Sequence, residues 1–116
     1  MVIRQGDIFW VNFGRSRGSE PSFRRPALVV QSDRFNRTDL NTTIVCPITT
    51  TMSLASKPGN VRLARGEANL PKSSVVLPVA VITIDRSMLL EHVGSLSRKR
   101  LGEVLQGLLL VLEPDA

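Results

Sequence analysis

Residues 7–13 read Asp-Ile-Phe-Trp-Val-Asn-Phe (DIFWVNF), a run of β-branched and aromatic side chains that offers alternating faces. This pattern predicts a strand. The next stretch, residues 14–26 (GRSRGSEPSFRRP), is rich in glycine, proline and serine and predicts a loop. Residues 27–31 (ALVVQ) form a short continuous apolar run, which is typical of a buried strand.

The remainder of the chain continues the strand pattern. Residues 43–50 (TIVCPITT) predict a strand in which Pro47 indicates a sheet edge or a bulge. Residues 74–84 (SVVLPVAVITI) predict two strands, or one bent strand, around Pro78. Shorter strands are expected at residues 60–63 and 88–93.

One helix is expected, with Ser97 as its cap and its end near Leu112. Five side chains fall on one face at helical spacing, and residues 108–112 (LLLVL) are apolar all round. Such a turn favours burial by a partner subunit, although packing under a neighbouring loop would also explain it. The five are Leu101, Val104, Leu105, Leu108 and Leu112. We therefore predict a single domain, residues 1–116, of the α+β class and mainly β.

The composition excludes several kinds of site. The chain has 116 residues, one cysteine (Cys46) and one histidine (His92), so neither an internal disulfide nor a histidine pair can form. No apolar run approaches the roughly 20 residues that cross a membrane, and the first residues lack the apolar stretch of a secretory signal. We expect a cytoplasmic protein with no membrane partner.

The charge is unevenly distributed. The net charge is +5 and twelve of the fifteen cations are arginine, which favours a polyanionic partner, although a basic excess can also serve solubility alone. Residues 1–40 and 41–80 each carry a net +3, whereas residues 81–116 carry −1. The excess therefore belongs to the strand-and-loop region.

Two clusters could carry chemistry. Four arginines (Arg15, Arg17, Arg24 and Arg25) surround Glu20, which is either their ion-pair partner or a proton acceptor that they keep ionised. Residues 49–51 are three threonines at a predicted strand end. They are either simple strand formers or hydroxyl donors to a phosphate oxygen.

In the order and spacing of its motifs, the chain resembles the MazF/PemK family of toxin endoribonucleases over nearly its whole length. The matching segments are Gly6–Phe13 (GDIFWVNF), Gly18–Glu20 (GSE), Arg25–Val30 (RPALVV), Phe35-Asn36 after Ser32-Asp33, Pro47–Thr50 (PITT), Thr83–Asp85 (TID) and Val93–Leu96 (VGSL).

The resemblance implies a small SH3-like barrel, or curved antiparallel sheet, with a C-terminal helix. It also implies cofactor-free and metal-independent cleavage of single-stranded RNA at short preferred sites, by 2′-OH attack to give a 2′,3′-cyclic phosphate and a 5′-OH. Arg25 and Thr49 match the catalytic arginine and threonine, and Glu20 matches an acidic position with a base role. The expected substrate-binding residues are Ser19, Arg24, Arg17, Thr50 and Asn36.

The implied partners are RNA, a second copy of the chain and a MazE-like antitoxin whose acidic tail covers the basic groove. Operator DNA is expected only through the antitoxin complex.

The chain departs from the family at two places. Leu77 and Val79 stand where some members have an Arg–Asp acid–base pair, and the Gln-Ile-Arg that precedes Thr83 elsewhere is missing. A gyrase-inhibiting toxin of the CcdB type, which is related in fold, or a nucleic-acid binder without catalysis therefore stay as alternatives. We expect Asp85 to bond a turn and His92 to be a packed or surface residue.

Overall fold

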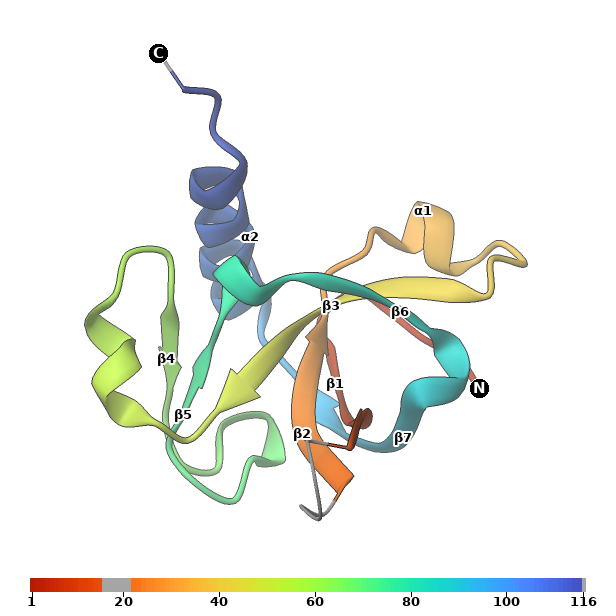
Figure 1. The fold of residues 1–116 in the computed structure, drawn as a ribbon, viewed down its shortest axis with the longest axis horizontal. Coiled ribbons are helices and arrows are strands. Elements are labelled where there is room, and N and C mark those ends of the chain that lie inside the picture. Colours follow the sequence, from red (N-terminus) through yellow and green to blue (C-terminus); the bar gives the residue numbers. More distant parts are fainter. Residues whose placement is uncertain (16–21, 116) are drawn as a thin grey trace.

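The computed structural model describes residues 1–15 and 22–115 (Figure 1). In this part of the chain, seven strands build one curled antiparallel sheet, and a single long helix, α2, follows the last strand. The predicted α+β class and the curved sheet are confirmed. The elements are β1 (Asp7–Arg15), β2 (Ser22–Val29), α1 (Asp33–Asn36), β3 (Thr42–Thr49), β4 (Val61–Leu63), β5 (Ser74–Val76), β6 (Ile82–Asp85), β7 (Leu89–Ser95), α2 (Arg98–Leu112) and four short 3-10 turns at Met52–Ser56, Glu67–Asn69, Pro78–Ala80 and Arg86–Met88.

Strand β3 is shared by two halves of the sheet. The strand order is β4-β5-β3-β2-β1-β7, and β6 pairs with the first half of β3 while β5 pairs with its end. Pro47 lies between these two pairings, and its carbonyl accepts a hydrogen bond from the Leu77 N–H at 3.0 Å. The expectation that Pro47 marks an edge or a bulge is wrong, because β3 has partner strands on both sides. The interruption lies in the neighbouring chain, between β5 and β6, opposite Pro47, which has no N–H to donate.

The two faces of the sheet bury separate apolar clusters. One cluster, which includes Ile8, Leu28 and Ile48, packs against α2 through the fully buried Val104. The other, which includes Phe9 and Val29, lies on the opposite face. Because side chains alternate along a strand, consecutive residues of β1 and β2 supply both clusters.

Helix α2 has the predicted cap and the predicted end. The Ser97 hydroxyl oxygen accepts a hydrogen bond from the Arg100 N–H at 3.2 Å. The Arg100 guanidinium bonds Glu67 at 2.7 Å and Glu103 at 3.1 Å, so it ties the first turn of the helix to the loop before β5. Gly107 lies against the backbone of Gly59, where a β-carbon would come within 2.2 Å of the Gly59 carbonyl oxygen.

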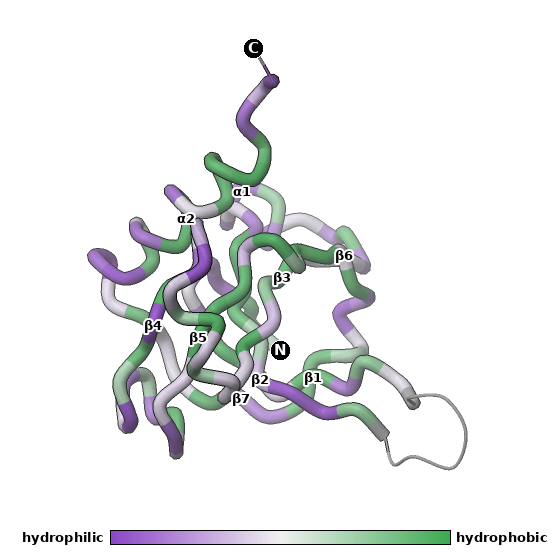
Figure 2. Tube along the Cα trace, turned by 60° about the vertical axis from the view of Figure 1, so that its left-hand side comes forward, coloured by the Kyte–Doolittle hydropathy of each residue, from purple (hydrophilic) through white to green (hydrophobic). Residues whose placement is uncertain are grey.

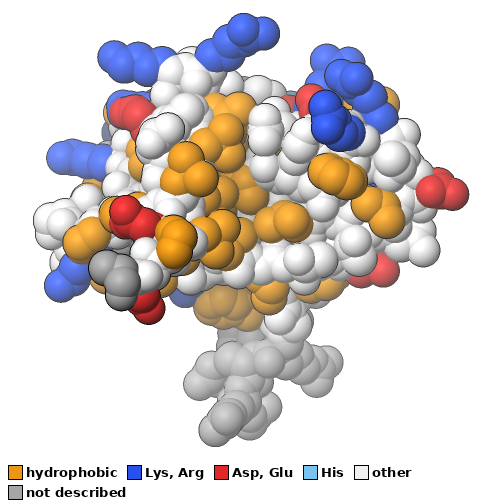
Figure 3. Space-filling model, turned by 90° about the horizontal axis from the view of Figure 1, so that it is seen from above, with side chains coloured by type: hydrophobic (Ala, Val, Ile, Leu, Met, Phe, Trp, Pro, Cys, Tyr) orange, Lys and Arg blue, Asp and Glu red, His pale blue; other side chains and the backbone are white. Residues whose placement is uncertain are grey.

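The last turn of α2 stays apolar and uncovered (Figure 2). Leu112, expected on the buried face, is 69% exposed, because no described residue reaches this end of the helix closely enough to cover it. An apolar groove runs from Leu108 and Leu112 across Ile82 of β6 to Phe35 of α1. Seen from above, hydrophobic side chains gather across the middle of this face, while Arg and Lys stand at its margins (Figure 3).

A two-stranded ribbon replaces much of the predicted loop 14–26. β1 continues to Arg15 and β2 begins at Ser22, so the loop prediction is wrong for the residues on either side of the segment 16–21. The two strands pair with each other out to Arg15 and Ser22, whereas β3 pairs with β2 only from Ala27 onward. Pro26, which has no N–H, lies one residue beyond the end of the β2–β3 ladder. Figure 1 shows β2 and β3 diverging below this point.

Candidate active site

Arg25 and Thr49 lie on the same face of the sheet, on the two strands that diverge. Ala27 pairs with Pro47, and stepping two residues outward along each strand leads to Arg25 and Thr49. Because a step of two residues returns to the same face, both side chains belong to the face that also carries Phe9 and Val29. Strand alternation therefore puts Arg25 and Thr49 on one face, on neighbouring strands that diverge beyond the Ala27–Pro47 pair.

The Arg25 side chain is half-buried and packs against an aromatic ring. Its guanidinium carbon lies 4.2 Å from the centroid of the Phe23 ring. The Phe23 ring in turn meets Phe13 at a centroid distance of 6.5 Å, with a tilt of 59°. No other described residue forms an ion pair or a hydrogen bond with the Arg25 side chain, so its N–H groups are unused within the part of the chain that the structure describes.

Thr49 ends β3 with its hydroxyl in a small network. Thr49 is 7% exposed and pairs with Val75 of β5. Its hydroxyl oxygen accepts a hydrogen bond from the Thr51 N–H at 3.2 Å and lies 3.2 Å from the Thr51 hydroxyl oxygen. Thr50, the next residue, is exposed. The strand end thus presents a fixed hydroxyl beside two exposed threonines.

Arg24 belongs to the opposite face of the ribbon. It follows Phe23 in β2 and pairs with Asn12 of β1, so its side chain leaves the sheet on the side away from Arg25. The Arg24 guanidinium carbon lies 6.0 Å from the centroid of Trp10, which is half-buried on that side. The two neighbouring arginines therefore serve different surfaces. A substrate-binding role for Arg24 stays a prediction, on the face away from Thr49.

Asn36 is far from this pair and its side chain is engaged within the protein. Its amide oxygen accepts hydrogen bonds from Gln31 and from Thr43, both at 2.9 Å, and its amide nitrogen donates to the Gln31 carbonyl at 2.8 Å. Asn36 is 6% exposed and sits beside the start of β3, about 20 Å along that strand from Thr49. This geometry holds a turn and leaves the predicted RNA contact unsupported.

The remaining predicted site residues, Arg17, Ser19 and Glu20, lie outside the described residues. Sequence reasoning missed Phe23, which contacts Arg25, and named Thr51, which contacts Thr49, only as a member of the threonine cluster. The signal for Phe23 is period-two alternation: once β2 is known to begin at Ser22, Phe23 and Arg25 must share a face.

Other polar residues are structural. Burial raises the pKa of the Cys46 thiol to about 12. Asp85 accepts a hydrogen bond from the Ser87 N–H at 2.8 Å, and its bonds to Ser87 lower the pKa of the carboxyl. His92 lies on the surface, 3.5 Å from an Asp7 oxygen.

Neither a metal-binding cluster nor a membrane span is found among the described residues. Residues 1–15 and 22–115 contain no group of three His, Cys, Asp or Glu side chains that could hold a metal ion. In the same ranges, no helix has the length and apolar character needed to cross a membrane.

Fold and site together define a small α+β half-barrel with an exposed basic ribbon beside a strand-end hydroxyl. Residues 4–112 match the family described as PemK-like, MazF-like toxin of type II toxin–antitoxin systems. The chain is 41% identical over 113 residues to endoribonuclease MazF6 of Mycobacterium tuberculosis, covering 97% of this chain and 99% of that one. It is 32% identical to endoribonuclease MazF of Staphylococcus saprophyticus, covering 89% of this chain and 85% of that one.

The fold agrees with solved structures. A MazE–MazF structure from Deinococcus radiodurans matches with a TM-score of 0.81 and 28% identity, covering 99% of both chains. A mycobacterial endoribonuclease solved with its cognate antitoxin matches with a TM-score of 0.77 and 18% identity, covering 98% of this chain and 99% of that one. The chain belongs to the PemK-like, MazF-like toxin family.

Proposed function

We propose that this chain is an endoribonuclease toxin that cleaves single-stranded RNA without a metal ion. The observation that carries the proposal is the shared face of Arg25 and Thr49, because it lets a guanidinium and a hydroxyl reach one phosphate. Relatives at 41% and 32% identity are named endoribonucleases, which supports the same activity here.

The proposed reaction is an internal transfer. The 2′-oxygen attacks the neighbouring phosphorus, the bond from phosphorus to the 5′-oxygen breaks, and the products are a 2′,3′-cyclic phosphate and a 5′-OH. Arg25 stabilises the charge that develops on the phosphoryl oxygens, and Thr49 positions the phosphate through its hydroxyl. Glu20 accepts the 2′-OH proton, and Arg25 returns a proton to the leaving oxygen.

Ser19, Arg17 and Thr50 are proposed to bind the RNA around the cut, and Arg24 is proposed to bind it from the opposite face of the ribbon. Positive charge in this region favours binding to the phosphate backbone and makes the binding depend on salt.

A second copy of the chain and an antitoxin complete the proposal. We propose that the apolar groove over Ile82 is covered by the same face of a second copy, because exposed Phe35 and Leu112 extend its apolar surface at 51% and 69% exposure. MazE–MazF complexes among the structural relatives support an antitoxin partner, whose acidic segment would cover the basic ribbon. Operator DNA would be bound only through that complex.

The test is cleavage of a mixed-sequence single-stranded RNA in EDTA, with the product ends identified by mass spectrometry. A substrate with a 2′-deoxy sugar at the cut position should stay intact. We expect Arg25→Ala to lower kcat about 10²- to 10³-fold, as loss of a transition-state charge partner does.

The matched control is the adjacent Arg24→Ala, on the opposite face, which should weaken binding and leave kcat nearly unchanged. Intact RNA for the wild-type protein over a wide range of sequences, together with inhibition of gyrase supercoiling, would instead support a CcdB-type toxin. Salt-dependent RNA binding without any product would support a nucleic-acid binder.

A further inference from the structure

The Arg25 guanidinium contacts the ring of Phe23, a residue outside the segments that match the family motifs. Its carbon lies 4.2 Å from the Phe23 ring centroid, well within the range of an attractive cation–π contact. Phe23 and Arg25 are two residues apart in β2, so they leave the same face of the strand. The contact is therefore a product of strand geometry.

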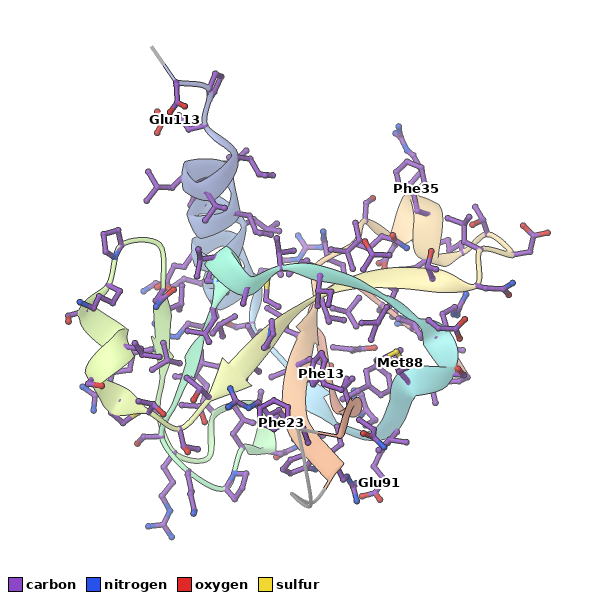
Figure 4. The ribbon with its side chains drawn as sticks, viewed as in Figure 1. Phe13, Phe23, Phe35, Met88, Glu91 and Glu113 are labelled. Atoms are coloured by element: carbon purple, nitrogen blue, oxygen red, sulfur yellow. The ribbon has the colours of Figure 1, made fainter. Side chains whose placement is uncertain are left out.

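The ring has support of its own. Phe23 meets Phe13 of β1 at 6.5 Å between centroids, and Phe13, like Met88, packs against the buried cluster that contains Phe9 and Val29. Figure 4 labels Phe13, Phe23 and Met88 along this side of the sheet, with Phe23 on the side of β2 that faces the end of β3. The buried cluster thus contacts Phe13, Phe13 contacts Phe23, and Phe23 contacts the Arg25 guanidinium.

A ring is a suitable support for a phosphate-binding arginine. A carboxylate partner would occupy the N–H groups of the guanidinium, whereas an aromatic ring attracts the cation without supplying a carboxylate oxygen for those donors. Within the described residues, no carboxylate contacts Arg25. The cation is then restrained without losing the donors that a phosphate needs.

We propose that Phe23 is a positioning residue that holds the Arg25 guanidinium in the orientation required for catalysis. This inference rests on the proposed function, since it deepens the role of Arg25 in RNA cleavage. Phe23 itself does not touch the reacting atoms. Its effect should therefore appear in kcat, because the transition state needs the oriented cation more than the bound substrate does.

The experiment compares Phe23→Leu and Phe23→Tyr with the wild-type protein in RNA cleavage, with kcat and KM determined separately. We expect Phe23→Leu to lower kcat about three- to thirtyfold with a smaller change in KM, and Phe23→Tyr to restore most of kcat. The control is Leu40→Ala, which removes an apolar side chain of similar exposure (43% against 39%) before β3. It should leave kcat unchanged.

A second readout does not depend on cleavage. The side-chain protons of Arg25 should carry a ring-current shift in the NMR spectrum of the free protein, retained in Phe23→Tyr and lost in Phe23→Leu. If the wild-type protein cleaves no RNA, the proposed function fails while this contact can still be measured.

Three results would overturn the inference. They are an unchanged kcat in Phe23→Leu, a rise in KM with unchanged kcat, which would make Phe23 a base-stacking residue, and an Arg25 shift that Phe23→Leu does not alter.

Discussion

The hydroxyl oxygen of Thr49 accepts a hydrogen bond from the backbone N–H of Thr51 at 3.2 Å and lies 3.2 Å from the Thr51 hydroxyl oxygen. A hydroxyl that accepts one hydrogen bond becomes a better donor for the next, because hydrogen bonds in a chain polarise one another. The Thr49 hydroxyl in turn donates to the Thr51 hydroxyl oxygen, so Thr51 sets the direction of the proposed catalytic hydroxyl.

Thr51→Val should lower kcat for RNA cleavage about three- to tenfold, because it removes the hydroxyl oxygen that orients the Thr49 hydroxyl and keeps the shape and the backbone N–H. Thr51→Ser, which keeps the hydroxyl, should retain most of the activity. Steady-state kinetics of the two variants provide the comparison. Equal activity in both variants and the wild-type protein would remove Thr51 from the site.

Gly107→Ala should destabilise the chain by about 1–3 kcal/mol, because its β-carbon would lie 2.2 Å from the Gly59 carbonyl oxygen and 3.0 Å from Pro78. The matched control is Gly102→Ala in the same helix, where nothing lies within 4 Å of the added atom. That change should stabilise by up to about 1 kcal/mol through helix propensity. Urea unfolding measures both, and equal shifts in the two variants would contradict the close approach of α2 to Gly59.

The Glu67–Arg100 pair should make the free energy of unfolding depend on pH in the acid range. Partial burial alone would raise the pKa of Glu67, but the hydrogen bonds from Arg100 and from the Ala64 N–H, with the Arg100 charge, lower it below the usual 4.5. A carboxyl whose pKa is lowered on folding stabilises the protein above its unfolded pKa, and this stabilisation is lost as the pH falls through the folded value. The free energy of unfolding should therefore decrease below about pH 4.5.

Glu67→Gln should flatten this decrease, as measured by urea unfolding between pH 6 and pH 3. Glu91→Gln, which removes an exposed carboxylate with no ion-pair partner among the described residues, is the control for loss of charge alone. A slope that is as steep in Glu67→Gln as in the wild-type protein would contradict the assignment.

Ile82→Glu should convert the proposed dimer to a monomer, because it places a charge in the middle of the apolar groove at a residue that is 45% exposed. Leu90→Glu, on β7 and 36% exposed, is the control outside the groove. Light scattering after size-exclusion chromatography measures the mass of each. A wild-type monomer would refute dimerisation, and a dimeric Ile82→Glu would place the interface elsewhere.

Local patterns in the sequence predicted most of the elements. Helix α2, with Ser97 as its cap, and the two strands around Pro78 are found as expected, because capping and proline act within a few residues. The ribbon was missed because its strands are stabilised by pairing with each other, against the local preference of glycine and serine for loops. The position of Pro47 depends on which strands flank β3, and local sequence does not contain that information.

The candidate site was predicted in part. The family resemblance singled out Arg25 and Thr49, and antiparallel pairing places them on one face. The contact of Phe23 with Arg25 depends on which residues of β2 share a face, and the contact of Thr51 with Thr49 depends on the turn after β3. Both depend on where the strands begin and end, which local sequence does not determine.

The adjacency of Arg24 and Arg25 in an alternating strand has an evolutionary consequence. Each face of the ribbon can be altered by substitution without disturbing the other, so Arg24 and Trp10 can vary on one face while Arg25 stays under a separate constraint on the other. A single-residue deletion between Arg25 and Ala27 is different, because it would exchange the two faces at once. Related sequences should therefore differ in this ribbon by substitutions and should have no insertion or deletion between Arg25 and Ala27.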